Sequence, residues 1–152
     1  MNQIKTEIII NAPIEHVWKT LLDFQAYPQW NPFIKKIDGS PTSGTNLVVT
    51  IQPPGQKPMK FRPQILTISD YHFSWIGSLG IKTLFAGEHN FKLEDEASNQ
   101  TRLRHFERFS GILHKPILAM IGKSTQNGFN SMNLALKDLC EKTHINSTIN
   151  LN

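Results

Sequence analysis

The residues best suited to chemistry lie in one stretch, "GEHNFKLEDEASNQTRLRHFERFSG", residues 87–111. Alternate residues of this stretch separate into an apolar set and a charged set, which predicts half-buried strands. The apolar set nevertheless contains His89, His105 and Glu107. A carboxylate in an apolar interior must be hydrogen-bonded, protonated or hydrated, and a neighbouring imidazole satisfies it most simply.

Three interpretations of this polar group stay open at the level of sequence. The residues can form a satisfied network that sets the strand register. They can hold the polar head of an otherwise apolar ligand. They can also act as catalytic candidates, with a His and Glu pair serving as general base in an aldol-type cyclisation or a hydration. Two histidines and a carboxylate can form a facial metal triad, but the sequence supplies no supporting second group of ligands, so we predict no metal.

The pairing of the two strands follows from the polar tip of their hairpin. A turn near Ala97 and Ser98 makes opposing residue numbers sum to 194–196. The contacts expected in that range are Leu93 with Thr101, Phe91 with Leu103, His89 opposite or diagonal to His105 and Glu107, and Phe85 near Phe109. An upstream strand paired through a turn at 79–80 is expected to bring Trp75 near Phe85. The predicted ligand-binding wall therefore consists of Trp75, Phe85, His89, Phe91, Leu103, His105, Glu107, Phe109, Phe129 and Met132.

The elements that must position this wall are predominantly β. Residue alternation and turn chemistry predict seven strands, at 4–10, 33–38, 45–52, 57–68, 71–78, 81–94 and 100–111. Between the first two strands, "IEHVWKTLLDF" and "QAYPQWNPF" predict two short helical segments. After Gly111 the apolar period becomes helical over about 25 to 30 residues, which predicts one long amphipathic helix. A long sheet needs cover on one face, so we expect the sheet to curl around that helix.

The overall composition narrows the class of protein. A chain of 152 residues indicates one domain, predicted at 1–143, with a flexible tail at 144–152 that shows no sustained period. The net charge is +4, but the basic residues lie among acidic ones on a predicted mixed-sign face, so we predict no nucleic-acid partner. The single cysteine, Cys140, the absence of a signal-peptide pattern and the absence of a spanning apolar run predict a cytoplasmic protein without stable membrane insertion.

The order of these elements, with "APIEHVWKTLLDFQAYPQWNP" near the start and "GEHNFKLEDEASNQTRLRHFERFSG" before a final helix, resembles the SRPBCC superfamily, also called START-like or helix-grip proteins. Within it, the chain is similar to small bacterial polyketide cyclase/dehydrase-like domains. The resemblance implies an α+β helix-grip fold, in which a curved seven-stranded antiparallel sheet grips the C-terminal helix. It also implies an apolar cavity between sheet and helix that binds hydrophobic small molecules.

The resemblance does not imply one reaction, because members include carriers, cyclases, receptors and co-chaperone domains. The expected function is binding, for carriage or sensing, of a hydrophobic or amphipathic small molecule, lipid-like ligands included, in the internal cavity. The first alternative is a cofactor-independent cyclase or hydratase that uses His89, His105 and Glu107. The second is a protein-interaction module, which needs an exposed apolar patch. No phosphate loop, nucleophile elbow or cofactor motif is present in the sequence, and no cofactor is expected.

Overall fold

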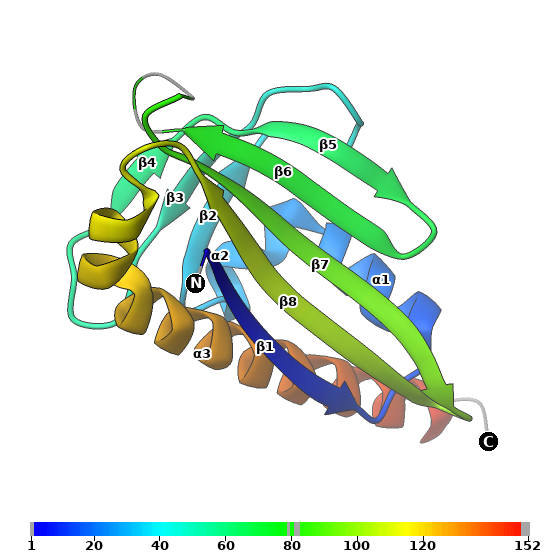
Figure 1. Cartoon of the computed structure of the whole chain (residues 1–152). Coiled ribbons are helices and arrows are strands. Elements are labelled where there is room, and N and C mark those ends of the chain that lie inside the picture. The colour runs from blue at the N-terminus through cyan, green and yellow to red at the C-terminus, as the bar shows by residue number, and fades with distance from the viewer. Residues whose placement is uncertain (1, 79, 81–82, 150–152) are drawn as a thin grey trace.

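The computed structural model describes residues 2–78, 80 and 83–149, in which curved antiparallel sheet lies over one long helix (Figure 1). Twelve elements occur in these residues. The strands are β1 (Gln3–Ile10), β2 (Ile34–Asp38), β3 (Val48–Ile51), β4 (Met59–Phe61), β5 (Gln64–Ser69), β6 (His72–Ser78), β7 (Ala86–Ala97) and β8 (Gln100–Ser110). The helices are α1 (Ile14–Leu22), the 3-10 turn η1 (Phe24–Ala26), α2 (Tyr27–Trp30) and α3 (His114–Ile149). The α+β class, the antiparallel sheet on a long C-terminal helix and the short helices after the first strand are as predicted.

The strands form two antiparallel sheets. One has the order β1-β8-β7-β6-β5 and the other the order β2-β3-β4. The two sheets meet where β5 follows β4, and an isolated bridge between Asn46 and Gln64 joins them. Figure 1 shows the larger sheet curving over α3, with the smaller sheet closing the end at which α3 begins.

The strand predicted at 57–68 is two strands, so the described residues contain eight strands and not seven. The break falls at Arg62 and Pro63, between β4 and β5. Proline has no N–H to donate to a ladder, so a continuous strand is interrupted there. The Pro63 carbonyl instead accepts a hydrogen bond from the Leu47 N–H at 2.8 Å. The chain thereby passes from the small sheet to the large one.

The strand predicted at 81–94 starts later, at Ala86. Residues 81 and 82, together with residue 79 of the predicted turn, lie outside the described residues. Thr83 lies in a turn, and its carbonyl accepts a hydrogen bond from the Ile112 N–H at 3.2 Å. This segment therefore faces the loop after β8 before β7 begins.

The β7–β8 hairpin has its register at the upper limit of the predicted range. His89 pairs with Glu107, Phe91 with His105, and Leu93 with Leu103. The predicted pairs Leu93 with Thr101 and Phe91 with Leu103 are therefore wrong by two residues. The turn is at Ser98 and Asn99, one residue later than predicted, and the register shifts between Asp95 and Ala97. Because the observed pairs differ from the predicted ones by two residues, an even number, every side chain keeps its predicted face.

Helix α3 closes the inner face of the large sheet. It buries Phe129, Met132 and Leu136, which the helical period places on one apolar stripe, and it also buries Cys140, whereas Leu139 of that stripe is only partly buried. Gly128 allows a close approach, since a Cβ there would lie 2.3 Å from the Phe33 ring. The helix has 36 residues and continues to Ile149, so the part of the predicted tail from 144 to 149 is helical. Among the described residues, no helix combines the length and apolarity needed to cross a bilayer.

The outer face of the large sheet carries the mixed charges expected from sequence. Arg102 bonds Glu96 at 2.6 Å and also contacts Glu7 on β1. Arg104 lies 3.1 Å from Glu94. Exposed pairs of this kind contribute little individually, about 0 to 1 kcal/mol each. Arg102 and Arg104 of β8 are thus paired with carboxylates of the neighbouring strands.

Candidate functional site

The three chemically suited residues lie on the inner face of the large sheet, where the alternation predicted them. His105 is fully buried, and His89 is 5% exposed. The Glu107 side chain is 18% exposed, because it lies at the edge of a pocket. His89 comes from β7, and the other two residues come from β8.

A continuous chain of hydrogen bonds connects these residues to α3 and β1. The Nε2 atoms of His89 and His105 are 2.7 Å apart. The other ring nitrogen of His105, Nδ1, lies 2.7 Å from Oδ1 of Asn133 on α3. The Asn133 amide donates to the Thr6 hydroxyl at 2.9 Å, and this hydroxyl donates to the His105 carbonyl at 3.0 Å.

The donor and acceptor of each hydrogen bond in this series can be assigned by starting from the His105 carbonyl. The His105 carbonyl only accepts, so the Thr6 hydroxyl is the donor to it and accepts from the Asn133 NH₂ group. The Asn133 oxygen then accepts from His105 Nδ1–H, which leaves Nε2 of the neutral His105 ring as an acceptor. His89 must therefore donate through Nε2–H. Its Nδ1 is left with a free lone pair directed towards Glu107.

Burial keeps both imidazoles uncharged. Desolvation lowers the pKa of His89 to about 3. Desolvation also lowers the pKa of His105 well below its ordinary value; a charge on His89 acts in the same direction, and the Asn133 hydrogen bond opposes it. The His105 ring lies between aromatic rings, stacked on Phe129 with a centroid distance of 3.9 Å and 4.5 Å from Phe91. No water-like environment is available there to solvate an imidazolium.

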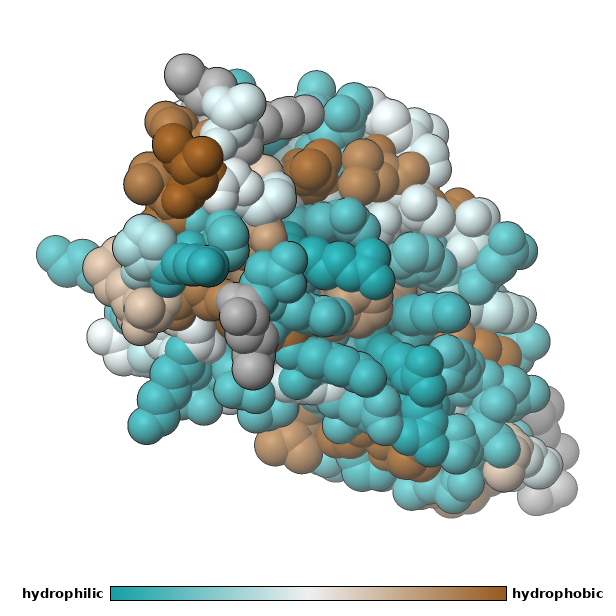
Figure 2. Space-filling model, viewed as in Figure 1, coloured by the Kyte–Doolittle hydropathy of each residue, from teal (hydrophilic) through white to brown (hydrophobic). Residues whose placement is uncertain are grey.

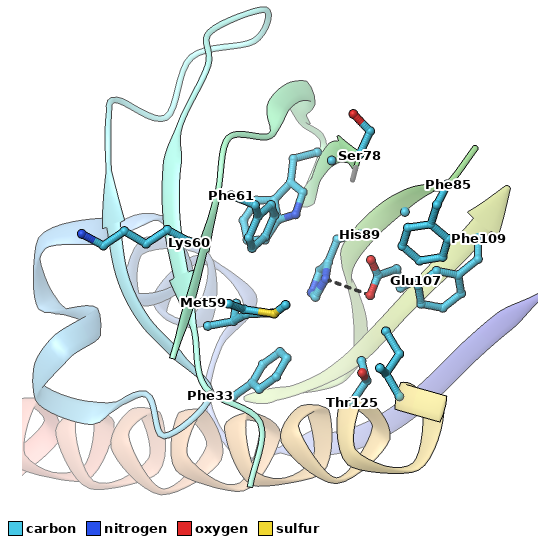
Figure 3. A pocket seen from close by; sticks show the side chains of 15 residues that line it. Phe33, Met59, Lys60, Phe61, Ser78, Phe85, His89, Glu107, Phe109 and Thr125 are labelled. Carbon is cyan, nitrogen blue, oxygen red and sulfur yellow. Dashed lines mark ion pairs between the residues drawn. The ribbon is translucent and has the colours of Figure 1, made fainter. Parts of the chain in front are cut away.

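Glu107 is the polar group with an incomplete set of partners. Its Oε2 lies 3.7 Å from His89 Nδ1, which is too long for a hydrogen bond (Figure 3). Desolvation raises the pKa of the Glu107 carboxyl to about 8. At neutral pH the pair therefore consists of a protonated carboxyl and a neutral imidazole. A group placed between them would find one donor and one lone pair.

Gly87 makes room for this carboxyl. A Cβ at position 87 would lie 2.2 Å from Glu107 Oε1 and 3.5 Å from the Phe109 ring. On a strand, glycine often marks a close approach of this kind. Gly87 of the "GEH" motif therefore shapes the site without contributing a functional group.

A pocket opens in front of Glu107, at the end of the large sheet that lies next to β4 and the first turns of α3 (Figure 3). Its volume is about 110 Å³. Its walls are mostly aromatic and aliphatic, and its residues are Phe33, Ile51, Met59, Lys60, Phe61, Trp75, Gly77, Ser78, Phe85, Gly87, His89, Glu107, Phe109, Ile121 and Thr125. Met59 is 45% exposed and Lys60 is exposed, so β4 forms part of the mouth.

Half of the predicted ligand wall lines this pocket. Trp75, Phe85, His89, Glu107 and Phe109 do so. The other five predicted residues, Phe91, Leu103, His105, Phe129 and Met132, are fully buried in the packed core and do not line it. Trp75 faces His89 across the β6–β7 ladder, with ring centroids 4.9 Å apart, and is not the cross-strand neighbour of Phe85 that the sequence suggested. The middle of the space between sheet and helix is filled, and the open space is at one end.

Sequence reasoning missed the residues that join the site from outside the hairpin. Met59, Lys60 and Phe61 come from β4, which was hidden inside the predicted strand 57–68. Asn133 carried one available signal, because it is a polar residue on the apolar stripe of α3 between Phe129 and Leu136. Thr6 alternates with Ile4 and Ile8 and looked like an ordinary strand residue.

The arrangement does not resemble a metal centre. The described residues contain no group of three or more His, Cys, Asp or Glu side chains placed to share an ion. The two His Nε2 atoms are committed to each other, and His105 Nδ1 is committed to Asn133. Only His89 Nδ1 and Glu107 retain free acceptors, fewer than a metal site requires.

Comparisons with known proteins agree on the fold. A family model described as "Polyketide cyclase / dehydrase and lipid transport" matches residues 1–141. A START superfamily protein from Mycobacterium smegmatis is 20% identical, with a TM-score of 0.73 and coverage of 93% of this chain and 98% of that one. A hypothetical protein from Helicobacter pylori is 15% identical, with a TM-score of 0.73 and coverage of 91% and 88%.

Norcoclaurine synthase from Thalictrum flavum, solved in complex with dopamine and hydroxybenzaldehyde, is also similar in structure. It is 13% identical, with a TM-score of 0.69 and coverage of 90% of this chain and 84% of that one. A comparison with curated protein sequences gave no match. At these identities the solved structures establish the START-like fold, and the family model establishes the family.

Proposed function

The chain belongs to the polyketide cyclase/dehydrase and lipid transport family, and on that premise we propose that it binds a small, uncharged, largely aromatic or aliphatic molecule in the pocket beside Glu107. The observation that carries the proposal is the mostly buried Glu107 carboxyl, 3.7 Å from its nearest ionisable neighbour His89, on the wall of an apolar pocket. Apolar walls with few polar groups are the usual composition of small-molecule sites. The ligand's polar group is proposed to lie against Glu107 and His89.

The size of the pocket limits the ligand. A volume of about 110 Å³ is smaller than the roughly 300 to 1,000 Å³ of sites that enclose drug-sized molecules. Apolar cavities of roughly 150 Å³ accept a single benzene ring. We therefore propose that one ring or a short chain enters the pocket while the rest of the ligand extends past Met59 and Lys60.

The low tolerance of the pocket for negative charge limits the ligand further. Burial raises the pKa of Glu107, which means that the pocket disfavours a negative charge at this point. A carboxylate ligand would meet the same cost and would also drive Glu107 to stay protonated. A neutral carbonyl group can instead accept a hydrogen bond from the Glu107 carboxyl. The proposed ligand class is thus neutral and carries a hydrogen-bond acceptor.

Two measurements test this function. Native mass spectrometry of freshly purified protein asks whether a small apolar molecule accompanies it. NMR titration with acetophenone and with benzoate, which differ in charge but not much in size, then tests the class. We expect shifts of pocket residues with acetophenone and at least tenfold weaker binding of benzoate. Glu107→Gln keeps a donor and should retain acetophenone binding, whereas Glu107→Ala should lose it; equal binding of the two probes would contradict the proposal.

The second candidate function is an enzyme that moves a proton, and the free lone pair on His89 Nδ1 favours it. In this scheme Nδ1 takes a proton from the carbon next to a ligand carbonyl, while the Glu107 carboxyl donates its proton to the carbonyl oxygen, giving an enol. Such a step would begin an aldol-type cyclisation.

Deuterium exchange into the methyl group of acetophenone in D₂O separates the two functions. An enzyme should accelerate the exchange, and Glu107→Gln should abolish the acceleration while sparing binding. A binding protein should bind acetophenone without accelerating exchange. The wild-type and Glu107→Gln proteins would then bind acetophenone alike and show the same exchange rate.

A further inference from the structure

The loops beside the pocket expose a group of large aliphatic side chains. Ile112 is 78% exposed, Leu113 is 42% exposed and Leu84 is 37% exposed. Backbone hydrogen bonds hold the two loops together, from the Leu113 N–H to the Leu84 carbonyl at 2.9 Å and from the Ile112 N–H to the Thr83 carbonyl at 3.2 Å. Figure 2 shows a hydrophobic patch over the segment that joins β8 to α3. We call Leu84, Ile112 and Leu113 the aliphatic tip.

The aliphatic tip adjoins the pocket. Leu84 directly precedes Phe85, whose ring stacks on Phe109 with centroids 5.7 Å apart, and both rings line the pocket. Gly111 brings the two loops together, because a Cβ there would lie 2.5 Å from the Leu84 carbonyl oxygen. The tip thus adjoins, along the chain and through backbone hydrogen bonds, the segment that supplies the Phe85 wall of the pocket.

The segments around the tip carry positive charge and almost no negative charge. Residues 39–69, 71–87 and 108–137 contain no Asp or Glu. They supply Lys57 and Lys60 from the β3–β4 region and Lys115 and Lys123 from the first turns of α3, all of them exposed. Gln56 donates to Ser124 at 3.0 Å, so the loop bearing Lys57 lies against the turn bearing Lys123. None of these lysines forms an ion pair with a residue that the structure describes.

At the opposite end of the molecule acidic residues are present, and several of them pair with basic ones, as Glu96 does with Arg102 and Glu94 with Arg104. The β7–β8 hairpin tip carries Glu94, Asp95 and Glu96, and the β5–β6 turn carries Asp70. Both lie at the far end of the large sheet from the start of α3 (Figure 1). The aliphatic tip therefore lies at an end, called here the basic end, whose exposed lysines have few carboxylates nearby, whereas the far end combines acidic and basic residues.

We propose that the basic end docks reversibly on the surface of an anionic lipid bilayer, with the aliphatic tip in the interface and the surrounding lysines against the headgroups. Aliphatic side chains at the tip of a loop pair, flanked by basic residues, fit an interface that is apolar below and negatively charged above. Docking in this orientation would bring the mouth of the pocket to the lipid surface. The proposal does not require that the pocket bind any particular ligand.

Vesicle flotation with the whole chain tests the proposal. The probes are phosphatidylcholine vesicles with and without phosphatidylserine. We expect flotation only with phosphatidylserine, falling as salt is raised, because the lysines act through screened charge. Lys115→Gln and Lys123→Gln should each weaken binding about fivefold. The pair Ile112→Ser and Leu113→Ser should weaken it at least about tenfold, because the apolar contact is lost.

Matched controls come from exposed aliphatic residues of α3 that lie outside the tip. Leu134 is 58% exposed and Ile145 is 56% exposed. Leu134 is twenty positions along α3 from its start, or roughly 30 Å away. Leu134→Ser and Ile145→Ser should float like the wild type, and circular dichroism should show that every variant is folded.

Three results would overturn the proposal. One is equal flotation with both kinds of vesicle, since it would remove the role of anionic lipid. Another is flotation that the Ile112 and Leu113 substitutions leave unchanged. The third is self-association in sedimentation that those substitutions abolish in the absence of vesicles, because a second copy of the chain would then cover the tip. Acetophenone binding can succeed or fail in each case, so the two proposals fail separately.

Discussion

His105 and Glu107 lie two residues apart on the same face of β8, yet their surroundings differ completely. His105 is enclosed by Phe91 and Phe129 and has a partner at each ring nitrogen. Glu107 faces the pocket, with its one polar neighbour at 3.7 Å. The strand treats the two positions alike, so the difference comes from what α3 and β7 place opposite each residue. Whether a buried polar group is free to bind a ligand therefore depends on the residues packed against it, and its position on the strand does not decide this.

The largest loss of stability is expected when a hydrogen-bond partner of His105 is removed. In Asn133→Leu, the buried Nδ1–H of His105 loses its acceptor, so the free energy of unfolding should fall by about 2 to 3 kcal/mol. Chemical denaturation measures this loss. Asn127→Leu on the exposed face of α3 is the control and should change stability by less than about 0.5 kcal/mol.

The same substitution also tests the direction of the hydrogen-bond chain. With Asn133 intact, ¹⁵N NMR should show His105 protonated at Nδ1 and His89 protonated at Nε2. Asn133→Leu removes the group that sets this order, so the tautomers should change or mix. A wild-type spectrum with His89 protonated at Nδ1 would contradict the assignment.

Glu107 is expected to make the free energy of unfolding depend on pH. The unfolded carboxyl ionises near its ordinary value of 4.5, whereas the folded one keeps its proton up to about pH 8. Between these values the native carboxyl keeps a proton that the unfolded one has lost, so the contribution of Glu107 to stability falls with rising pH. The buried histidines act in the opposite direction below pH 6.5, so a net fall in wild-type stability is expected from pH 6.5 to about 8, with no further fall above that. Glu107→Gln cannot ionise and should be more stable than wild type above this range, by on the order of 2 kcal/mol.

The acid limb of the same experiment serves as the control. Burial lowers the pKa of His89 to about 3, so the unfolded state takes up a proton below 6.5 while the native state does not. Both proteins should therefore lose stability as the pH falls from 6.5 towards 3. Parallel curves for the two proteins above pH 6.5 would show that Glu107 is ionised in the native state.

A smaller effect on stability, with a larger one on binding, is expected at Gly87. In Gly87→Ala the new methyl group occupies the place of Glu107 Oε1. The carboxyl end can turn away, so stability should fall by only about 1 kcal/mol. Acetophenone binding, followed by NMR, should weaken at least about tenfold, since the hydrogen-bond donor is displaced.

Gly122→Ala is the matched control for Gly87→Ala. Its Cβ would meet only Leu118 of the same helix, at 3.4 Å. Stability should rise by about 1 kcal/mol, because alanine is the better helix former. Binding should stay unchanged. If Gly87→Ala binds acetophenone as well as Gly122→Ala does, Glu107 does not hold the ligand.

The smallest effect is expected on the outer face of the same strands. Glu94→Gln removes a partner of Arg104 that is partly open to solvent. We expect a change in the free energy of unfolding of less than about 0.5 kcal/mol, diminishing with salt. A loss comparable with that of Asn133→Leu would mean that the outer charges and not the inner network hold the sheet.

Much of the fold followed from local patterns. The alternation in β7 and β8 placed His89, His105 and Glu107 on the inner face, because successive strand residues point to opposite sides. The predicted apolar stripe, which includes Phe129, Met132 and Leu136, identified the face of α3 that is buried. The strand boundary at Pro63 was also available, since proline interrupts a ladder, but the continuous alternation around it concealed the break.

Other features depended on contacts between distant segments. Asn133 donates a hydrogen bond to Thr6, 127 residues away along the chain, and no local sequence pattern predicts such a pair. The pocket required β4, β7, β8 and α3 to come together. The sequence predicted a ligand wall along the whole inner face, whereas Phe91, Phe129 and Met132 fill the middle of it.

What the sequence alone determined is therefore the face on which each side chain lies, since strand and helix periods are properties of the local backbone. What only the tertiary structure decided is which of the inward polar groups is satisfied. Hydrogen bonds and packing join residues far apart in the chain, and these gave His105 its partners and left Glu107 beside open space. The physical reason is that burial acts through every neighbouring atom, whichever segment supplies it.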